Sequence, residues 1–167
     1  MVDVRIAVIG ATGAVGKVFL DLLKERNFPI STVRLCASER SWGQKLYVHG
    51  NEITIEQPTP DLLRNTDIVF ISANSSVSLE LAPMAVEYGA LAIDKSSAFR
   101  MDPSVPLVVP EVNGDDIEDH HGIIASPNCS TTPLVMALKP LNDVNKVRRV
   151  LVDTYQSVSG AGAAAMA

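Results

Sequence analysis

The stretch Val4-Arg5-Ile6-Ala7-Val8-Ile9-Gly10-Ala11-Thr12-Gly13-Ala14-Val15-Gly16 decides the fold of this chain. Its first part, Val4 to Ile9, is an apolar and β-branched run that predicts a strand. Three glycines follow at the spacing G-x-x-G-x-x-G. After them, apolar residues recur at helical spacing: Val18, Phe19, Leu22 and Leu23. The sequence therefore predicts a strand, a tight glycine turn and a helix, in that order.

This glycine turn is a variant of the dinucleotide-binding fingerprint. Glycines let the backbone turn tightly and approach a pyrophosphate that lies on the N-terminus of the following helix. A purely structural connection between strand and helix is the alternative. The position of the turn between a strand and an amphipathic helix favours nucleotide binding. The predicted cofactor contacts in the turn are Gly10, Thr12, Gly13, Ala14, Val15 and Gly16.

The next predicted strand, residues 33–37, ends where a Rossmann fold distinguishes the two nicotinamide cofactors. Glu39 there offers an acceptor for a ribose 2′-hydroxyl, as in NAD enzymes. Arg40, between Ser38 and Ser41, offers charge-assisted hydrogen bonds to a 2′-phosphate. We favour Arg40, and hence NADP, with Ser38 and Ser41 as further contacts. A solvated turn without a role is the alternative.

Further strands extend the pattern to a doubly wound, mostly parallel α/β sheet. In residues 46–55, apolar and polar residues alternate on both sides of a turn, which predicts a hairpin. Residues 67–73 form a continuous apolar run suited to a central parallel strand. Cofactors lie at the carboxyl ends of such strands, so Ala73 and Ser75 are predicted contacts, although helix capping is an alternative for these small residues. A helix over residues 77–88 follows.

A short strand over residues 91–93 leads to a polar and basic segment that ends at Arg100. The apolar pair before Arg100 predicts an anchored guanidinium that faces a fixed anion, with an ordinary surface arginine as the alternative. Residues 102–113 are rich in proline and predict an ordered loop or extended segment. A short acidic helix is expected over residues 114–120.

The segment Gly122-Ile123-Ile124-Ala125-Ser126-Pro127-Asn128-Cys129-Ser130-Thr131-Thr132-Pro133 predicts a strand, a turn with Cys129 at its tip and a helix over residues 133–144. A thiol at a helix N-terminus lies near unpaired N–H groups, which favour the thiolate and can hold an oxyanion. Cys129 is therefore a candidate nucleophile. A small buried hydrophobe is the alternative reading of an unpaired cysteine.

Residues 149–156 read as a final strand, and a glycine-rich turn follows it before the chain stops. Neither a capping signal nor a polar tail closes the sequence, so we expect a truncated chain. A strand without its sheet partners would expose apolar surface, which predicts aggregation or a partner chain that supplies the remainder.

Composition limits the possible functions of the 167 residues. A net charge of −5 without a run of Lys or Arg argues against nucleic-acid binding, and no apolar run is long enough to span a membrane. No metal-ligand spacing occurs, so no metal is expected. The two cysteines and the absence of a signal peptide predict a cytoplasmic protein with reduced thiols.

Six motifs in the same order over the chain resemble the aspartate-semialdehyde dehydrogenase family. They are the glycine turn 10–16, Ser38-Glu39-Arg40-Ser41, Ser97-Ala98-Phe99-Arg100, Val109-Pro110-Glu111-Val112-Asn113, Pro127-Asn128-Cys129-Ser130-Thr131 and Gln156-Ser157-Val158-Ser159-Gly160-Ala161-Gly162. The resemblance implies an NADP-binding Rossmann domain over residues 1–128. It also implies the truncated start of an α+β catalytic and dimerisation domain over residues 129–167.

The resemblance also implies roles for single residues. Cys129 is then the nucleophile, Asn128 helps to position the substrate, Gln156 orients the substrate amino acid and Arg100 binds phosphate. Residues 12–15 contact the pyrophosphate, Arg40 and Ser41 contact the 2′-phosphate, and Ser159 and Gly160 lie near the nicotinamide.

The implied reaction is the NADPH-dependent reductive dephosphorylation of L-aspartyl 4-phosphate to L-aspartate 4-semialdehyde, in lysine, threonine and methionine biosynthesis. Members of the family are about twice as long, form homodimers or homotetramers, and carry the acid–base histidine beyond residue 167. The chain alone is therefore expected to be inactive. The alternatives are N-acetyl-glutamyl-phosphate reductase, which typically has a Gly-Cys-Tyr-Pro-like turn at the nucleophile, and an inactive NADP-binding fragment.

Overall fold

A seven-stranded sheet forms the centre of the computed structural model, which describes residues 4–48 and 50–158. Its strands are β1 (Val4–Ile9), β2 (Ile30–Cys36), β3 (Lys45–Val48), β4 (Asn51–Glu56), β5 (Ile68–Ile71), β6 (Leu91–Asp94) and β7 (Ile123–Ala125). The helices are α1 (Ala14–Glu25), α2 (Pro60–Arg64), α3 (Ser75–Glu87), α4 (Pro110–Asn113) and α5 (Thr131–Val144), with 3₁₀ turns at Glu39–Ser41 and Gly114–Asp119. None of the helices in these ranges has the length and apolar character needed to cross a membrane.

The strand order is β3-β4-β2-β1-β5-β6-β7, and every neighbouring pair is parallel except β3 with β4. If only the parallel strands are numbered along the chain, this order becomes 3-2-1-4-5-6, which is the order of the Rossmann fold. The predicted class, a doubly wound and mostly parallel α/β sheet, is confirmed. The predicted hairpin over residues 46–55 is also present, as β3 and β4.

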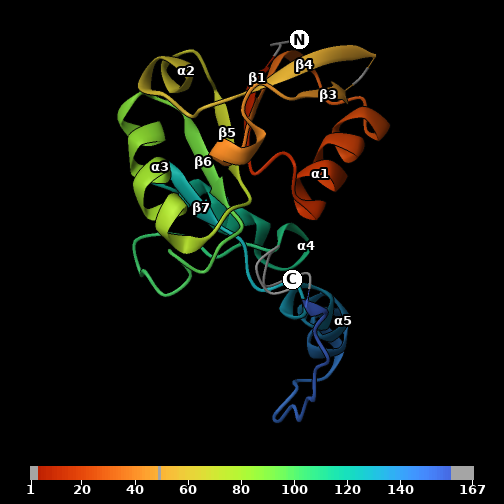
Figure 1. Cartoon of the computed structure of the whole chain (residues 1–167). Coiled ribbons are helices and arrows are strands. Elements are labelled where there is room, and N and C mark those ends of the chain that lie inside the picture. Colours follow the sequence, from red (N-terminus) through yellow and green to blue (C-terminus); the bar gives the residue numbers. More distant parts are fainter. Residues whose placement is uncertain (1–3, 49, 159–167) are drawn as a thin grey trace.

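The sheet is covered on both faces, as its sequence pattern requires. Alternate residues of β1 point to opposite sides, so Ile6 and Val8 pack in the core under α1, while Ala7 and Ile9 pack in the core under α2 and α3. Figure 1 shows α1 on one side of the sheet and α2 and α3 on the other. On the α1 side, the rings of Phe19 and Phe70 stack with their centroids 3.7 Å apart.

Several boundaries differ from the sequence-based expectations because local capping decides them. Helix α3 begins at Ser75 rather than at residue 77, because the side chain of Asn74 accepts a hydrogen bond from the backbone N–H of Val77. Within the segment expected to be an ordered loop, the structure places the short helix α4, which begins at Pro110. Helix α2, capped by Thr59, was not predicted.

The predicted final strand over residues 149–156 is wrong. These residues form no ladder with the sheet, and the side chains of Leu151 and Tyr155 are 87% and 100% exposed. A β-branched run forms a strand only where a neighbouring strand can pair with it, and the described residues offer none at this place. Helix α5, which begins at Thr131 rather than at residue 133, likewise has no buried residue and extends away from the sheet (Figure 1).

Candidate nucleotide and thiol site

A cavity of about 390 Å³ opens at the carboxyl ends of β1, β2 and β5. It lies at the point where the strand order reverses between β1 and β5, which is where ligands bind in open parallel sheets. Five of the predicted cofactor contacts line it: Gly10, Thr12, Gly13, Ser38 and Ala73. The structure therefore brings together residues from three different strand ends around one cavity.

The glycine turn is shaped by close packing. Gly10 has a φ of +85°, and a β-carbon added to it would lie 2.0 Å from the carbonyl oxygen of Ser72. A β-carbon on Gly16 would lie 2.4 Å from the carbonyl oxygen of Gly10. Both positions thus exclude any side chain, so these glycines bring β1, α1 and the end of β5 into contact.

The N-terminus of α1 is available to an anion. Its N-cap residue is Gly13, which has no side chain, so the first-turn N–H groups of Ala14, Val15 and Gly16 receive no side-chain cap. These groups and the positive end of the helix favour an anionic ligand such as a pyrophosphate.

Helix α3 begins at the same edge of the sheet, but a side chain caps its N-terminus. The side-chain oxygen of Asn74 accepts hydrogen bonds from the Val77 N–H at 3.0 Å and from the Ser76 hydroxyl at 2.8 Å. Of these two helix ends, α1 is therefore the one prepared for a ligand.

The turn after β2 frames one end of the cavity. The indole N–H of Trp42 donates to the carbonyl oxygen of Ala37 at 2.9 Å, which holds the indole against the cavity next to Ser38. Glu39 and Arg40 are exposed, and neither side chain forms an ion pair within the described residues. Arg40 and Ser41 do not line the cavity itself. The choice of NADP over NAD remains a prediction.

Sequence reasoning missed the part of the cavity that Trp42, the segment after β4 and helix α3 supply. The additional lining residues include Trp42, Gln57, Pro58, Val77, Glu80 and Leu81. The sequence pattern predicted the hairpin but not that β4 also pairs with β2 in parallel, with Leu35 opposite Ile55. That pairing carries the end of β4, and with it Gln57 and Pro58, to the ligand-binding edge.

A buried carboxylate holds the segment that follows β6. Asp94 is fully buried and accepts hydrogen bonds from the Ser78 hydroxyl at 2.8 Å, from the Ser96 N–H at 3.0 Å and from the Ser96 hydroxyl at 2.8 Å. The predicted contact Ser75 lies outside the cavity lining, but its hydroxyl is 3.0 Å from the hydroxyl of Ser97. The contacts of Ser78 with Asp94 and of Ser75 with Ser97 attach this segment to α3.

Arg100 stands at the end of this segment, and backbone carbonyl groups hold its guanidinium in place. Its Nε donates to the carbonyl oxygen of Ser126 at 2.8 Å and its Nη2 to the carbonyl oxygen of Lys95 at 2.9 Å, while Phe99 is buried beside it. The guanidinium is half-buried and keeps N–H groups that these two bonds do not use. An arginine held in this way is suited to bind an anion.

Cys129 is exposed, two residues before the start of α5. The side-chain oxygen of Asn128 accepts from the Ser130 N–H at 2.9 Å and from the Ser130 hydroxyl at 2.6 Å, and it lies 3.9 Å from the Cys129 sulfur. Asn128 therefore shapes the turn that presents the thiol. The alternative reading as a buried hydrophobe does not apply to Cys129.

Cys36 is the buried cysteine of the chain. It lies at the end of β2 with no exposed surface, and burial raises the pKa of its thiol to about 12. The two thiols thus differ in access, and only Cys129 can meet a substrate.

The glycine turn and Cys129 lie at the same edge of the sheet. Two strands, β5 and β6, separate β1 from β7, so these two strands are about 14 Å apart at the usual strand spacing, and Cys129 follows the end of β7 by four residues. Gln156 is exposed, and within the described residues no hydrogen bond joins it to Cys129 or Arg100. Ser159 and Gly160 lie outside the described residues. No group of His, Cys, Asp or Glu in residues 4–48 and 50–158 has the arrangement of a metal site.

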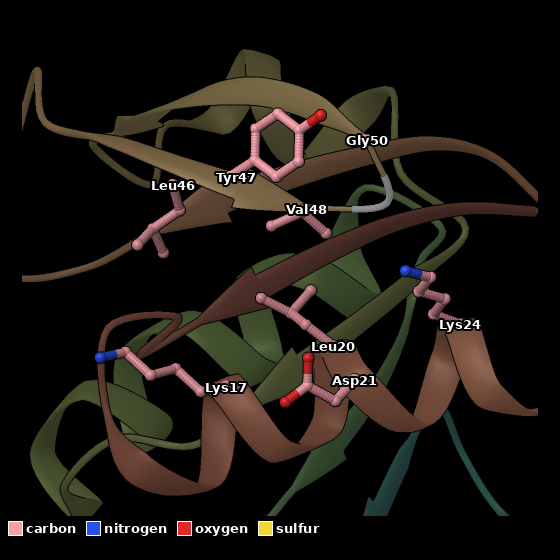
Figure 2. A pocket seen from close by; sticks show the side chains of 8 residues that line it. All are labelled: Lys17, Leu20, Asp21, Lys24, Leu46, Tyr47, Val48 and Gly50. Carbon is pink, nitrogen blue, oxygen red and sulfur yellow. The ribbon is translucent and has the colours of Figure 1, made fainter.

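A second cavity, of about 300 Å³, lies between α1 and the β3–β4 hairpin (Figure 2). Leu20 and Val48 are its buried apolar residues, and Lys17, Asp21 and Lys24 of α1 line it. None of its lining residues was predicted to bind a ligand, and it shares no residue with the cavity at the glycine turn.

A parallel sheet of this order, with a cavity and an uncapped glycine turn at its switch point, defines an NAD(P)-binding domain of the Rossmann type. A comparison with known families matches residues 5–120 to the profile "Semialdehyde dehydrogenase, NAD binding domain". The chain belongs to the aspartate-semialdehyde dehydrogenase family and contains its NAD-binding domain.

Individual relatives agree with this assignment. The chain is 50% identical over 158 residues to the aspartate-semialdehyde dehydrogenase of Bacillus subtilis. The matched region covers 95% of this chain and 46% of the relative. Aspartate semialdehyde dehydrogenase II from Vibrio cholerae, also solved in complex with ASA, is 42% identical with a TM-score of 0.92 over 99% of this chain and 50% of that one.

The Candida albicans enzyme, solved with NADP, is 29% identical with a TM-score of 0.71 over 87% of this chain and 48% of that one. The chain thus spans about half the length of the relatives it matches.

Proposed function

We propose that this chain is the N-terminal half of an NADP-dependent aspartate-semialdehyde dehydrogenase, which reduces L-aspartyl 4-phosphate to L-aspartate 4-semialdehyde. The observation that carries the proposal is the gathering of a glycine turn, an anchored arginine and an exposed cysteine at one edge of a single sheet. The identity of about half its residues to named aspartate-semialdehyde dehydrogenases supports it.

NADP fits the site on two observations. The cavity of about 390 Å³ lies at the switch point, and the first turn of α1 offers uncapped N–H groups for the pyrophosphate. Arg40 forms no ion pair with a carboxylate of the described residues, and it lies two positions after Ser38, which lines the cavity. Its guanidinium is therefore free to bind a 2′-phosphate, which favours NADP over NAD. When bound, the reduced cofactor supplies the hydride of the reaction.

Cys129 performs the first step of the proposed reaction. Its thiolate attacks the carbonyl carbon of the acyl phosphate, a C–S bond forms, and the bond from carbon to the phosphate oxygen breaks. Backbone N–H groups at the turn stabilise the oxyanion that forms in this step. The phosphate leaves with the electron pair of the broken bond towards Arg100. Reduction of the resulting thioester returns the Cys129 thiolate and releases the aldehyde.

The proposal places residues 1–128 in the cofactor domain and residues 129–167 at the start of a catalytic and dimerisation domain. Several apolar residues of α5 and the run at Val150, Leu151 and Val152 are exposed, which supports a further protein surface that covers them in the proposed enzyme. A homodimer or homotetramer in the cytoplasm belongs to the same proposal. Within it, Asn128 and Gln156 contact the substrate, and Ser159 and Gly160 contact the nicotinamide.

Calorimetric titration and an enzyme assay test the proposal together. The 167-residue chain should bind NADPH more tightly than NADH. The full-length protein should reduce NADP⁺ with L-aspartate 4-semialdehyde only when inorganic phosphate is present. Activity with N-acetyl-L-glutamate 5-semialdehyde instead would identify N-acetyl-glutamyl-phosphate reductase. Nucleotide binding without either activity would leave an NADP-binding module, and the proposed reaction would then be wrong.

A further inference from the structure

Lys95 and Arg100 converge on one residue, Ser126, at the end of β7. The Lys95 Nζ donates to the hydroxyl of Ser126 at 2.6 Å, and the Arg100 Nε donates to its carbonyl oxygen at 2.8 Å. Arg100 Nη2 also donates to the carbonyl oxygen of Lys95 at 2.9 Å. Two half-buried cations are thus both fixed on Ser126, which lies three residues before Cys129.

All partners that hold these two cations are neutral. Within the described residues, neither Lys95 nor Arg100 forms an ion pair, whereas the half-buried Arg34 forms a two-point pair with Glu56 at 3.1 and 2.6 Å. The adjacent carboxylate of Asp94 is buried and already accepts three hydrogen bonds from Ser78 and Ser96. The fold therefore brings two positive charges together without a carboxylate that pairs with them.

Electrostatics oppose this arrangement in the absence of a ligand. Burial and the neighbouring charge of Arg100 lower the pKa of Lys95, and the opposing effects of Cys129 and Asp94 are smaller. An anion between the two groups would reverse the second effect, because it attracts both charges. Donors remain for such an anion, since an ammonium has three N–H groups and a guanidinium has five, and each group uses only part of its set on protein acceptors.

We infer that Lys95 contributes to an anion subsite beside Cys129, where Lys95 and Arg100 both contact the phosphate group of the substrate. The inference rests on the proposed function, in which Arg100 receives the phosphate and Lys95 has no role. A dianionic phosphate matches two cations, whereas a carboxylate or an uncharged acyl group matches one at most. Lys95 thereby makes the site selective for an acyl phosphate, and Ser126 positions both cations.

Steady-state kinetics of the full-length protein in the oxidative direction separate this role from a structural one. Lys95→Gln should raise the KM for inorganic phosphate about tenfold or more, because one charge-assisted contact is lost, and leave the KM for the semialdehyde within about twofold. Lys95→Arg should restore part of the loss. Lys45→Gln removes an exposed lysine of the hairpin and should change neither KM. An unchanged phosphate KM in Lys95→Gln would overturn the inference.

A second measurement needs no enzymatic activity. Inorganic phosphate should slow the alkylation of Cys129 by iodoacetamide in the 167-residue chain, and Lys95→Gln should require about tenfold more phosphate for the same protection. Ser126→Ala, which keeps both cations, should show a smaller shift. Equal protection in wild type and Lys95→Gln, or no protection in wild type, would overturn the subsite. Protection together with a full-length protein that lacks semialdehyde activity would retain the subsite and reject the proposed function.

Discussion

The α-carbon of Gly10 faces the carbonyl oxygen of Ser72 so closely that a β-carbon on Gly10 would lie 2.0 Å from that oxygen. Ser72 follows β5, and its N–H donates to the carbonyl oxygen of Ile9 at 2.9 Å. The turn after β1 and the end of β5 are therefore in backbone contact at the switch point. This contact gives the floor of the nucleotide cavity a fixed shape, and it makes the first glycine of the turn a structural requirement.

Gly10→Ala should lower the free energy of unfolding by about 3 kcal/mol or more, since it combines a left-handed φ with a clash against backbone atoms. The matched control is Gly43→Ala, because Gly43 has a φ of +76° with no atom near the added β-carbon. This control should cost only about 1 kcal/mol. Urea denaturation followed by circular dichroism measures both values. Similar losses for the two variants would contradict the role assigned to the contact with Ser72.

Iodoacetamide at pH 7.5 should label Cys129 and leave Cys36 unmodified. Cys129 is exposed, whereas Cys36 is buried and its raised pKa of about 12 keeps the thiol protonated. Peptide mass spectrometry locates the adduct, and Cys129→Ser should remove it. The same raised pKa makes stability depend on pH in alkali. The protonated Cys36 thiol contributes fully to stability below about pH 9, and this contribution is lost as the pH rises towards about 12. Rapid labelling of Cys36 in the native chain would disagree with its burial.

Arg40→Gln should weaken NADPH binding about tenfold or more and leave NADH binding unchanged, because only NADPH carries the 2′-phosphate. Arg26→Gln, at the C-terminal end of α1, removes the same charge away from the cavity and serves as the control. Glu39→Gln distinguishes the alternative, since an NAD enzyme would lose NADH affinity in that variant. Titration calorimetry measures the dissociation constants of NADPH and NADH for the wild type and for each variant. A loss of NADH affinity in Glu39→Gln with no effect of Arg40→Gln would reverse the cofactor preference.

Ser78→Ala should lower the free energy of unfolding by about 1.5–3 kcal/mol, because it removes one of the donors to the fully buried carboxylate of Asp94. Ser76→Ala, on the exposed side of the same helix turn, should cost less than about 0.5 kcal/mol. Guanidinium denaturation compares the two variants. If Ser78→Ala were as mild as Ser76→Ala, the hydroxyl would not be needed to hold the Asp94 carboxylate.

Asp67→Asn should reduce stability at neutral pH but not in strong acid. Hydrogen bonds from the Arg5 side chain and its backbone N–H lower the pKa of Asp67 to about 2. A carboxyl with a lowered pKa stabilises the fold fully above its usual value of about 3.8, and this contribution disappears as the pH falls through about 2. The urea midpoints of the two proteins should therefore converge as the pH falls from 4. A constant difference over this range would argue against the linkage.

Local patterns predicted most of the cofactor half of the chain. The glycine turn and the hairpin each depend on residues close to one another in sequence. The position of Gln57 at the cavity depends instead on the parallel pairing of β2 with β4, which joins segments 20 residues apart. Hydrophobic periodicity does not encode such a pairing.

The C-terminal part could not be predicted in the same way. Residues 149–156 have the composition of a strand, but a strand also needs a neighbour with free backbone groups, and at the outer edge of β7 residues 106–108 already bond to Ala125. The role inferred for Lys95 was invisible for a related reason. The approach of its ammonium to Ser126 crosses 31 positions and depends on the pairing of β6 with β7.

Trp42 is the single tryptophan of the chain and lies on the wall of the nucleotide cavity, held there by its hydrogen bond to Ala37. Its ultraviolet emission consequently reports on one place in the molecule. A dinucleotide that enters the cavity changes the surroundings of the indole, and a reduced nicotinamide can accept its excitation energy. The protein therefore contains its own optical probe of cofactor occupancy, without an attached dye.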